Sequence, residues 1–163
     1  GTYPLPEAQL DRFLLKVLVP FPNEAELALI LDKTTGAAAA DPKPVMTAAD
    51  LAAYRALARE VVAAPPVRDF AVRVVLRTHP DRPGAPESVR RYVRYGASPR
   101  GAQALIAAAK VRALRKGRAH VALEDVAAFA APALRHRVLL NFEGEAEGVA
   151  VDRIVEDALA AAR

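Results

Sequence analysis

The chain has 163 residues, of which 53% are hydrophobic, and a formal net charge of +4 at pH 7. This length allows one domain with a core, or one domain with part of another. No apolar run reaches the ~18 residues that span a bilayer, and the first residues lack the pattern of a signal peptide, so we expect a cytoplasmic protein without a membrane span. The sequence contains no cysteine and only three scattered histidines, so we expect neither disulfides nor a metal site.

The charge is distributed unevenly along the chain. Residues 65–120 carry 13 basic and 3 acidic side chains, a net charge of +10, whereas the segments on either side are acidic overall. Such a block attracts nucleic acid, the phosphates of a nucleotide or an acidic partner surface. A solvated arginine-rich face accounts for it equally well, so charge alone leaves these alternatives open.

The N-terminal residues predict a short turn followed by a strand. Residues 7–12 suffice for barely one helical turn, and the apolar run from Phe13 to Val19 is typical of a strand in a buried parallel sheet. Neighbouring segments offer this strand no partner, so we expect residues outside this sequence to complete its sheet. Pro20-Phe21-Pro22 ends the segment as a connector.

The rest of the chain predicts helices joined by short loops. Asn23 with Glu26, and Thr47 with Asp50, have the spacing of helix N-terminal caps. Apolar stripes predict further helices over residues 67–79, 89–93, 98–116, 123–131 and 151–162, whereas residues 134–142 fit a helix or a strand. We therefore expect a mainly α fold, a helical bundle with a short N-terminal turn and strand. Because alanine supplies many of the apolar positions, the core should be thin.

The motif from Gly96 to Gly101, Gly-Ala-Ser-Pro-Arg-Gly, opens one of these helices. Ser98 suits the N-cap and Pro99 the first helical position. Arg100 then lies in the first turn, where a cation forgoes or loses about 0.3–1 kcal/mol unless an anion joins it. A phosphate is such an anion, because free N–H groups and the guanidinium would converge on its oxygens and Gly101 leaves the backbone approachable. A solvated side chain or a carboxylate partner for Arg100 is the simpler alternative.

Motifs that would carry chemistry by themselves are absent from this sequence. None of the glycines begins a Gly-x-x-x-x-Gly-Lys-Ser/Thr P-loop. There is also no Gly-x-Ser-x-Gly elbow, no His-Glu-x-x-His helix and no evident pair of catalytic carboxylates. We therefore expect these 163 residues alone to be inactive in nucleotide hydrolysis, with Arg100 acting as an accessory.

Two motifs in the correct order resemble the MoxR family of AAA+ ATPases. Leu10-Asp11-Arg12-Phe13 looks like the segment that follows sensor 1, and the motif from Gly96 to Gly101 resembles sensor 2, which opens a helix of the C-terminal lid. The similarity continues through residues 110–114, 117–118, 124–126 and 134–137, so it covers essentially the whole chain. For Arg135, His136 and Arg137, which match a family signature, we expect packing and hydrogen bonding between helices rather than contact with a ligand.

The resemblance implies a domain division and roles for two arginines. Residues 1–22 would be the end of the nucleotide-binding core and residues 23–163 the α-helical lid, with Walker A, Walker B and sensor 1 upstream. Arg12 would be the arginine finger, acting in trans on the γ-phosphoryl group bound by a neighbouring subunit. Arg100 would be the sensor 2 residue that reaches the phosphates of its own subunit, with Ser98, Pro99 and Gly101 beside it. The structural alternative for Arg12 is a salt bridge with Asp11 or Glu7.

For the whole protein, the resemblance implies an ATP hydrolase that uses Mg²⁺ and assembles into a ring, expected to be hexameric. It also implies partners with von Willebrand factor A domains, and a chaperone-like role in remodelling or maturing other protein complexes. One alternative from another class is a non-enzymatic helical module that binds nucleic acid through residues 65–120. Another is a pure oligomerisation domain. Under the ATPase interpretation we expect no nucleic acid partner.

Overall fold

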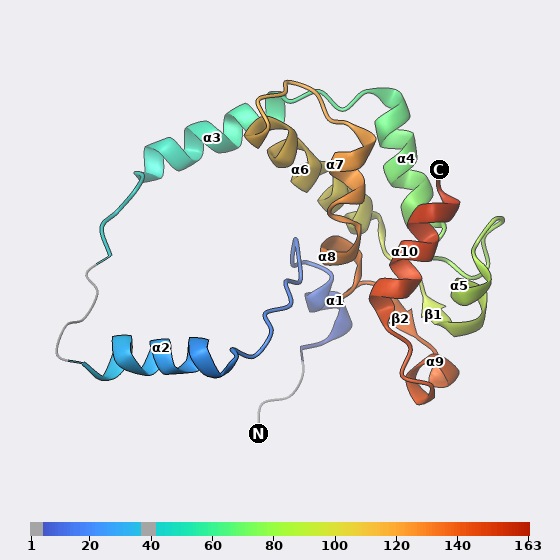
Figure 1. Cartoon of the computed structure of the whole chain (residues 1–163). Helices are drawn as coiled ribbons and strands as arrows, with labels where there is room; N and C mark the ends of the chain where they lie inside the picture. Colours follow the sequence, from blue (N-terminus) through green and yellow to red (C-terminus); the bar gives the residue numbers. More distant parts are fainter. Residues whose placement is uncertain (1–4, 37–41) are drawn as a thin grey trace. The chain divides into compact units, whose positions relative to one another are not determined.

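The computed structural model describes residues 5–36 and 42–163. Figure 1 labels the helices and the two short strands along the chain. The helices are α1 (Glu7–Leu10), α2 (Glu24–Thr35), α3 (Ala48–Glu60), α4 (Pro65–Leu76), α5 (Glu87–Tyr92), α6 (Pro99–Arg115), α7 (Leu123–Ala127), α8 (Ala130–Leu134), α9 (Phe142–Ala146) and α10 (Val151–Ala161). The strands are β1 (Val93–Tyr95) and β2 (Leu139–Leu140).

The chain divides into two compact units. The first comprises the described residues up to Lys16 together with Ala56–Arg163, and the second comprises those of Val17–Arg55. This division reflects packing, whereas the expected boundary after residue 22 concerns the parts of an AAA+ subunit, so that boundary stays a prediction. No helix among the described residues is both long and apolar enough to cross a membrane.

The second unit contains α2 and the first part of α3. Asn23 and Glu26 form the predicted capping box, each side chain accepting from the other residue's backbone N–H, at 3.0 and 2.9 Å. Thr47 and Asp50 make the same reciprocal bonds at 3.1 and 2.8 Å. Both predicted caps are therefore confirmed. Neither helix has a buried residue among those described, so within this unit their stability rests on capping and helix propensity rather than on packing.

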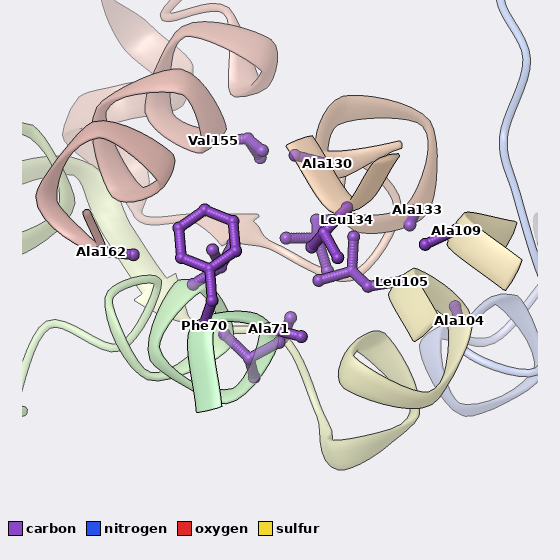
Figure 2. Close-up of a cluster of buried hydrophobic side chains, with 14 of the residues drawn as sticks. Phe70, Ala71, Ala104, Leu105, Ala109, Ala130, Ala133, Leu134, Val155 and Ala162 are labelled. Atoms are coloured by element: carbon purple, nitrogen blue, oxygen red, sulfur yellow. The ribbon is translucent and has the colours of Figure 1, made fainter. Parts of the chain in front are cut away.

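The first unit has a core to which α4, α6, α8 and α10 contribute. Figure 2 shows Phe70 of α4, Leu105 of α6 and Leu134 of α8 among the side chains of this cluster, all at most 2% exposed. Alanines supply many of the other contacts in the same cluster: Ala71, Ala104, Ala109, Ala130, Ala133 and Ala162. The mainly helical fold and its alanine-rich core are thus confirmed.

The strands differ from those predicted. β1 and β2 pair antiparallel, with Val93 opposite Leu140, and this pairing resolves the ambiguous segment 134–142 into a turn, a strand and the beginning of α9. The segment from Phe13 to Val19, which we predicted as a strand, has no regular structure in the described chain. A buried parallel strand needs neighbouring strands, and the described part of the chain supplies none for this segment.

The central position of Leu105 in the core is testable. Leu105→Ala should lower the free energy of unfolding by about 2–5 kcal/mol, because it leaves a cavity where the side chain is fully buried. Val111→Ala, on the same helix but 47% exposed, should cost less than ~1 kcal/mol. Chemical denaturation measures both values, and equal small losses would contradict the described packing.

Candidate functional site

Helix α6 begins as the sequence predicts. The N-cap residue is Ser98, whose Oγ accepts a hydrogen bond from the backbone N–H of Arg100 at 3.2 Å, and Pro99 occupies the first helical position. At the other end, Gly117 has a φ of +70° and follows the C-cap residue Lys116. This left-handed conformation costs glycine little, so Gly117 terminates the helix as expected.

The first backbone amides of α6 are not free, contrary to our expectation. The N–H of Arg100 is bonded to the Ser98 hydroxyl, the N–H of Gly101 donates to the Ser98 carbonyl at 2.8 Å, and Pro99 has no N–H. The N-cap and the first turn therefore use the donors at these positions. The Arg100 guanidinium, on a side chain that is 53% exposed, is the group of this turn that is accessible to an anion.

Gly101 has a packing role that the sequence did not reveal. The residue is buried, and a Cβ atom at this position would lie 2.9 Å from Leu134 Cδ2 and 3.2 Å from Ala97 Cβ. Its missing side chain therefore lets α6 approach α8 closely. Contact of Gly101 with a phosphate stays a prediction.

The carboxylate of Asp11 lies at the beginning of α6. The Ser98 hydroxyl lies 2.8 and 2.9 Å from its two oxygens, Arg100 Nη1 is 3.3 Å from Oδ2, and Arg137 Nε is 3.1 Å from Oδ1. Burial by itself raises the pKa of Asp11, but the hydrogen bonds from Ser98 and Arg100 and the charge of Arg137 hold it below its ordinary value. Asp11 is therefore ionised at neutral pH, and Arg100 has the carboxylate partner that we considered as an alternative.

Arg137 attaches the residues around Asp11 to the helical bundle. Its side chain is only 2% exposed. Besides the Asp11 carboxylate, the guanidinium donates to the backbone carbonyls of Asp11 at 2.9 Å, of Leu14 at 3.3 Å, and of Phe13 and Ala133. A buried cation is tolerated only where acceptors surround it, so these contacts fix the path of residues 11–14.

Arg135 and His136 hold the same segment. Arg135 forms a bidentate pair with Asp152 at 2.9 and 2.8 Å and donates to the carbonyl of Lys16 at 3.1 Å. His136 Nε2 lies 3.0 Å from the carbonyl oxygen of Phe13, and burial lowers the pKa of His136, so the ring is neutral and Nε2 carries the donated proton. Residues 135–137 thus form hydrogen bonds within the chain, as we expected.

The identity of the segment that residues 135–137 bind was not predicted. Sequence reasoning assigned these side chains to contacts between helices, whereas several of their partners lie in residues 11–16. One signal was present in the sequence: Arg135 and Arg137 stand between the apolar residues Leu134 and Val138, and a cation that is buried requires acceptors.

Arg12 is exposed beside this attachment. With Gln9 and Phe13 it lines an open cavity of about 370 Å³. Neither Asp11 nor Glu7 pairs with it, and no other ion pair involves Arg12 among the described residues. The salt bridge considered as its alternative role is therefore not formed in the described structure. Asp11, the residue before it, contacts Arg100, so one carboxylate connects the neighbourhoods of the two candidate arginines.

A second charge cluster accounts for part of the basic block. The carboxylate of Asp125 is fully buried, binds Arg118 through two bonds of 2.7 Å and contacts Arg112 at 3.2 Å. The hydrogen bonds from Arg118 lower the pKa of Asp125, although burial opposes this effect. Several cations of residues 65–120 therefore serve internal pairing.

Comparison with known proteins agrees with this architecture. The segment from residue 86 to residue 158 matches a family described as the AAA lid domain. Because of this similarity we call residues 86–158 the lid. Arg100 and Arg137 lie inside the lid, whereas Asp11 and Arg12 precede it, so the cluster around Asp11 joins the lid to residues before it.

Relatives match nearly the whole chain. "Chaperone MoxR1" of Mycobacterium tuberculosis is 33% identical over 98% of this chain and 42% of its own length, and "Uncharacterized protein YeaC" of Bacillus subtilis is 32% identical over 100% and 48%. A crystal structure of a candidate ATPase from Cytophaga hutchinsonii has a TM-score of 0.89 and 30% identity, over 98% of this chain and 49% of that one. The resemblance to MoxR-family AAA+ ATPases is thus confirmed, and the chain spans less than half the length of each of these proteins.

The attachment of residues 11–16 to the lid depends on Arg137. Arg137→Met keeps the length of the side chain but removes every donor, so hydrogen exchange at the Lys16 amide, bonded to the Pro132 carbonyl at 2.8 Å, should accelerate at least about tenfold. Arg91→Met, which removes an exposed ion pair of the lid, should leave this rate unchanged. Equal rates in all three proteins would show that Arg137 does not hold the segment.

Proposed function

We propose that this chain is the lid, together with the end of the nucleotide-binding core, of a MoxR-type AAA+ ATPase that remodels or matures other protein complexes with ATP. The AAA lid match and the similarity to a protein named as a chaperone support this proposal. The observation that carries it is structural. Arg100 in the lid contacts the carboxylate of Asp11 in the segment before it, Arg12 is the residue that follows Asp11, and both arginines are exposed.

In this proposal Arg100 is the sensor 2 residue. Its guanidinium lies in the first turn of α6, where the helix dipole favours a negative group, and its present partner is a carboxylate in a partly exposed pair. A nucleotide phosphate offers more charge and three oxygens to the same donors. Ser98, Pro99 and Gly101 set the conformation from which Arg100 projects.

Arg12 is the proposed arginine finger. An exposed guanidinium without an ion-pair partner among the described residues is accessible to a phosphate carried by a neighbouring subunit. Such a group stabilises the charge that develops on the oxygens of the transferred γ-phosphoryl group. Attachment through Asp11 and Arg137 would hold its backbone in place for this contact.

The chain offers a residue that could bind the phosphates of ATP, but its described residues do not offer a set of ligands for the metal ion. The exposed Arg100 suits the phosphates of ATP. No group of three His, Asp or Glu side chains suited to a metal ion occurs among the described residues, so Mg²⁺ would be held by the phosphates and by residues other than these. When bound, ATP and Mg²⁺ supply the phosphoryl group and the charge that polarises it.

Assembly belongs to the same proposal. A hexameric ring would bring Arg12 of one subunit to the nucleotide of the next, and von Willebrand factor A domain proteins and client complexes would be the partners of a cytoplasmic machine. Within residues 5–36 and 42–163, no specific contact favours the nucleic acid alternative. Arg91, Arg112 and Arg118, all within the basic segment 65–120, pair with carboxylates of the same chain.

Substitutions in the whole protein separate the two roles. Arg12→Ala should lower kcat about 10³-fold or more while nucleotide affinity changes little, because a finger contacts the transition state of a neighbour's nucleotide. Arg100→Ala should weaken nucleotide binding, turnover or both by about 10- to 100-fold, the effect of one charge-assisted hydrogen bond.

The control for these substitutions is Arg153→Ala, which removes an arginine that is 72% exposed and leaves the site intact. ATP turnover and nucleotide binding are measured on the same preparations. Turnover at the wild-type level in both the Arg12 and the Arg100 variants would contradict the proposed function.

A further inference from the structure

The Asp11 carboxylate holds its partners with unequal strength. Toward the bundle it meets Arg137, whose side chain is 2% exposed, and toward solvent it meets Arg100, whose side chain is 53% exposed. The buried contact is reinforced because Arg137 also binds the carbonyl of Asp11. The exposed contact is long, at 3.3 Å, and water screens it. An incoming anion would therefore displace Asp11 from Arg100 more readily than from Arg137.

The Ser98 hydroxyl belongs to the exposed half of this arrangement. A hydroxyl has a single proton, and the Ser98 proton is directed to the Asp11 carboxylate, while its oxygen accepts from the Arg100 amide. A cavity of about 180 Å³ adjoins Asp11, Ser98 and Arg137, so the carboxylate is not fully enclosed. Asp11 thus occupies the donors that a phosphate group at Arg100 would also use.

We propose that Asp11 is a positioning residue that competes with a phosphate group for Arg100 and Ser98, so that occupancy of Arg100 alters the segment that carries Arg12. The proposal rests on the function proposed above. When phosphate takes Arg100 and Ser98, Asp11 loses its hydrogen bonds with both residues and keeps only its buried partner Arg137. The loss of these contacts shifts residues 11–13 about the bonds that Arg137 keeps with the carbonyls of Asp11 and Phe13. Coupling of this kind is reciprocal, so the state of the Arg12 segment also changes the affinity at Arg100.

The competition is measured on the 163-residue chain by titration with inorganic pyrophosphate at low salt, followed by NMR of backbone amides and arginine Nε–Hε groups. Asp11→Asn should bind pyrophosphate about two- to fivefold more tightly than wild type, because the competing charge is removed from an exposed pair. Asp11→Glu keeps the charge and should bind as wild type does. In wild type, the Phe13 amide signal should shift in step with the Arg100 signal.

The matched control is Asp69→Asn. It changes the net charge by the same amount, and Asp69 lies exposed on α4, about 10 Å along the helix from its end at Leu76. The end of α4 lies close to the beginning of α6, because the hydroxyl of Thr78, two residues after Leu76, accepts a hydrogen bond from the Ala97 amide at 2.9 Å. Asp69→Asn should therefore produce less than half of the gain in affinity of Asp11→Asn.

Failure of this proposal and failure of the proposed function give different results. If Arg100→Gln leaves pyrophosphate binding unchanged, Arg100 is not an anion site and both are overturned. If Arg100→Gln weakens binding but Asp11→Asn behaves like Asp69→Asn, the competition is overturned while the Arg100 assignment stands. Should Asp11→Asn fail to fold, the wild-type titration decides: saturation of Arg100 without a shift at Phe13 overturns the coupling.

Discussion

The buried cation of Arg137, together with Arg135 and His136, attaches the residues before the lid to it. The guanidinium of Arg137 lies inside the first unit and must find acceptors there, since an unpaired buried charge costs several kcal/mol. The acceptors come from the carboxylate and carbonyl of Asp11 and from the carbonyls of Phe13 and Leu14. These residues have no regular secondary structure. The hydrogen bonds from Arg137 to their carbonyl groups therefore replace the backbone hydrogen bonds that a helix or a sheet would provide.

The same attachment connects the two arginines that we propose bind phosphates. Arg12 follows a residue that Arg137 holds, and Arg100 contacts that residue from the first turn of α6. Of these three arginines, only Arg137 is buried away from water, while Arg12 and Arg100 remain exposed. This arrangement suits the proposed function. The buried Arg137 fixes the position of the segment, whereas an exposed arginine can exchange a carboxylate for a phosphate at a small cost in free energy.

Local features of the fold could be predicted and long-range ones could not. The capping box of Asn23 and Glu26 and the N-cap at Ser98 depend on residues two or three positions apart, which the sequence displays directly. The strand at Phe13 to Val19 was predicted from apolarity alone, but strand formation needs partners that the described residues lack. For the site, the first-turn position singled out Arg100 and the resemblance singled out Arg12. The contact between Arg137 and Asp11 joins residues 126 positions apart, so nothing in the local sequence indicated which residue Arg137 binds.

The segment carrying Arg12 and the lid carrying Arg100 should behave as one body, because Arg137 joins them. The chain has no native cysteine, so Gln9→Cys with Gln103→Cys places two spin labels at exposed positions, one in α1 and one on α6. Pulsed electron paramagnetic resonance should give a single narrow distribution of distances between the two spin labels, and this distribution should broaden when Arg137→Met is added. A distribution that is already broad with Arg137 present, or that stays narrow without it, would contradict the claim.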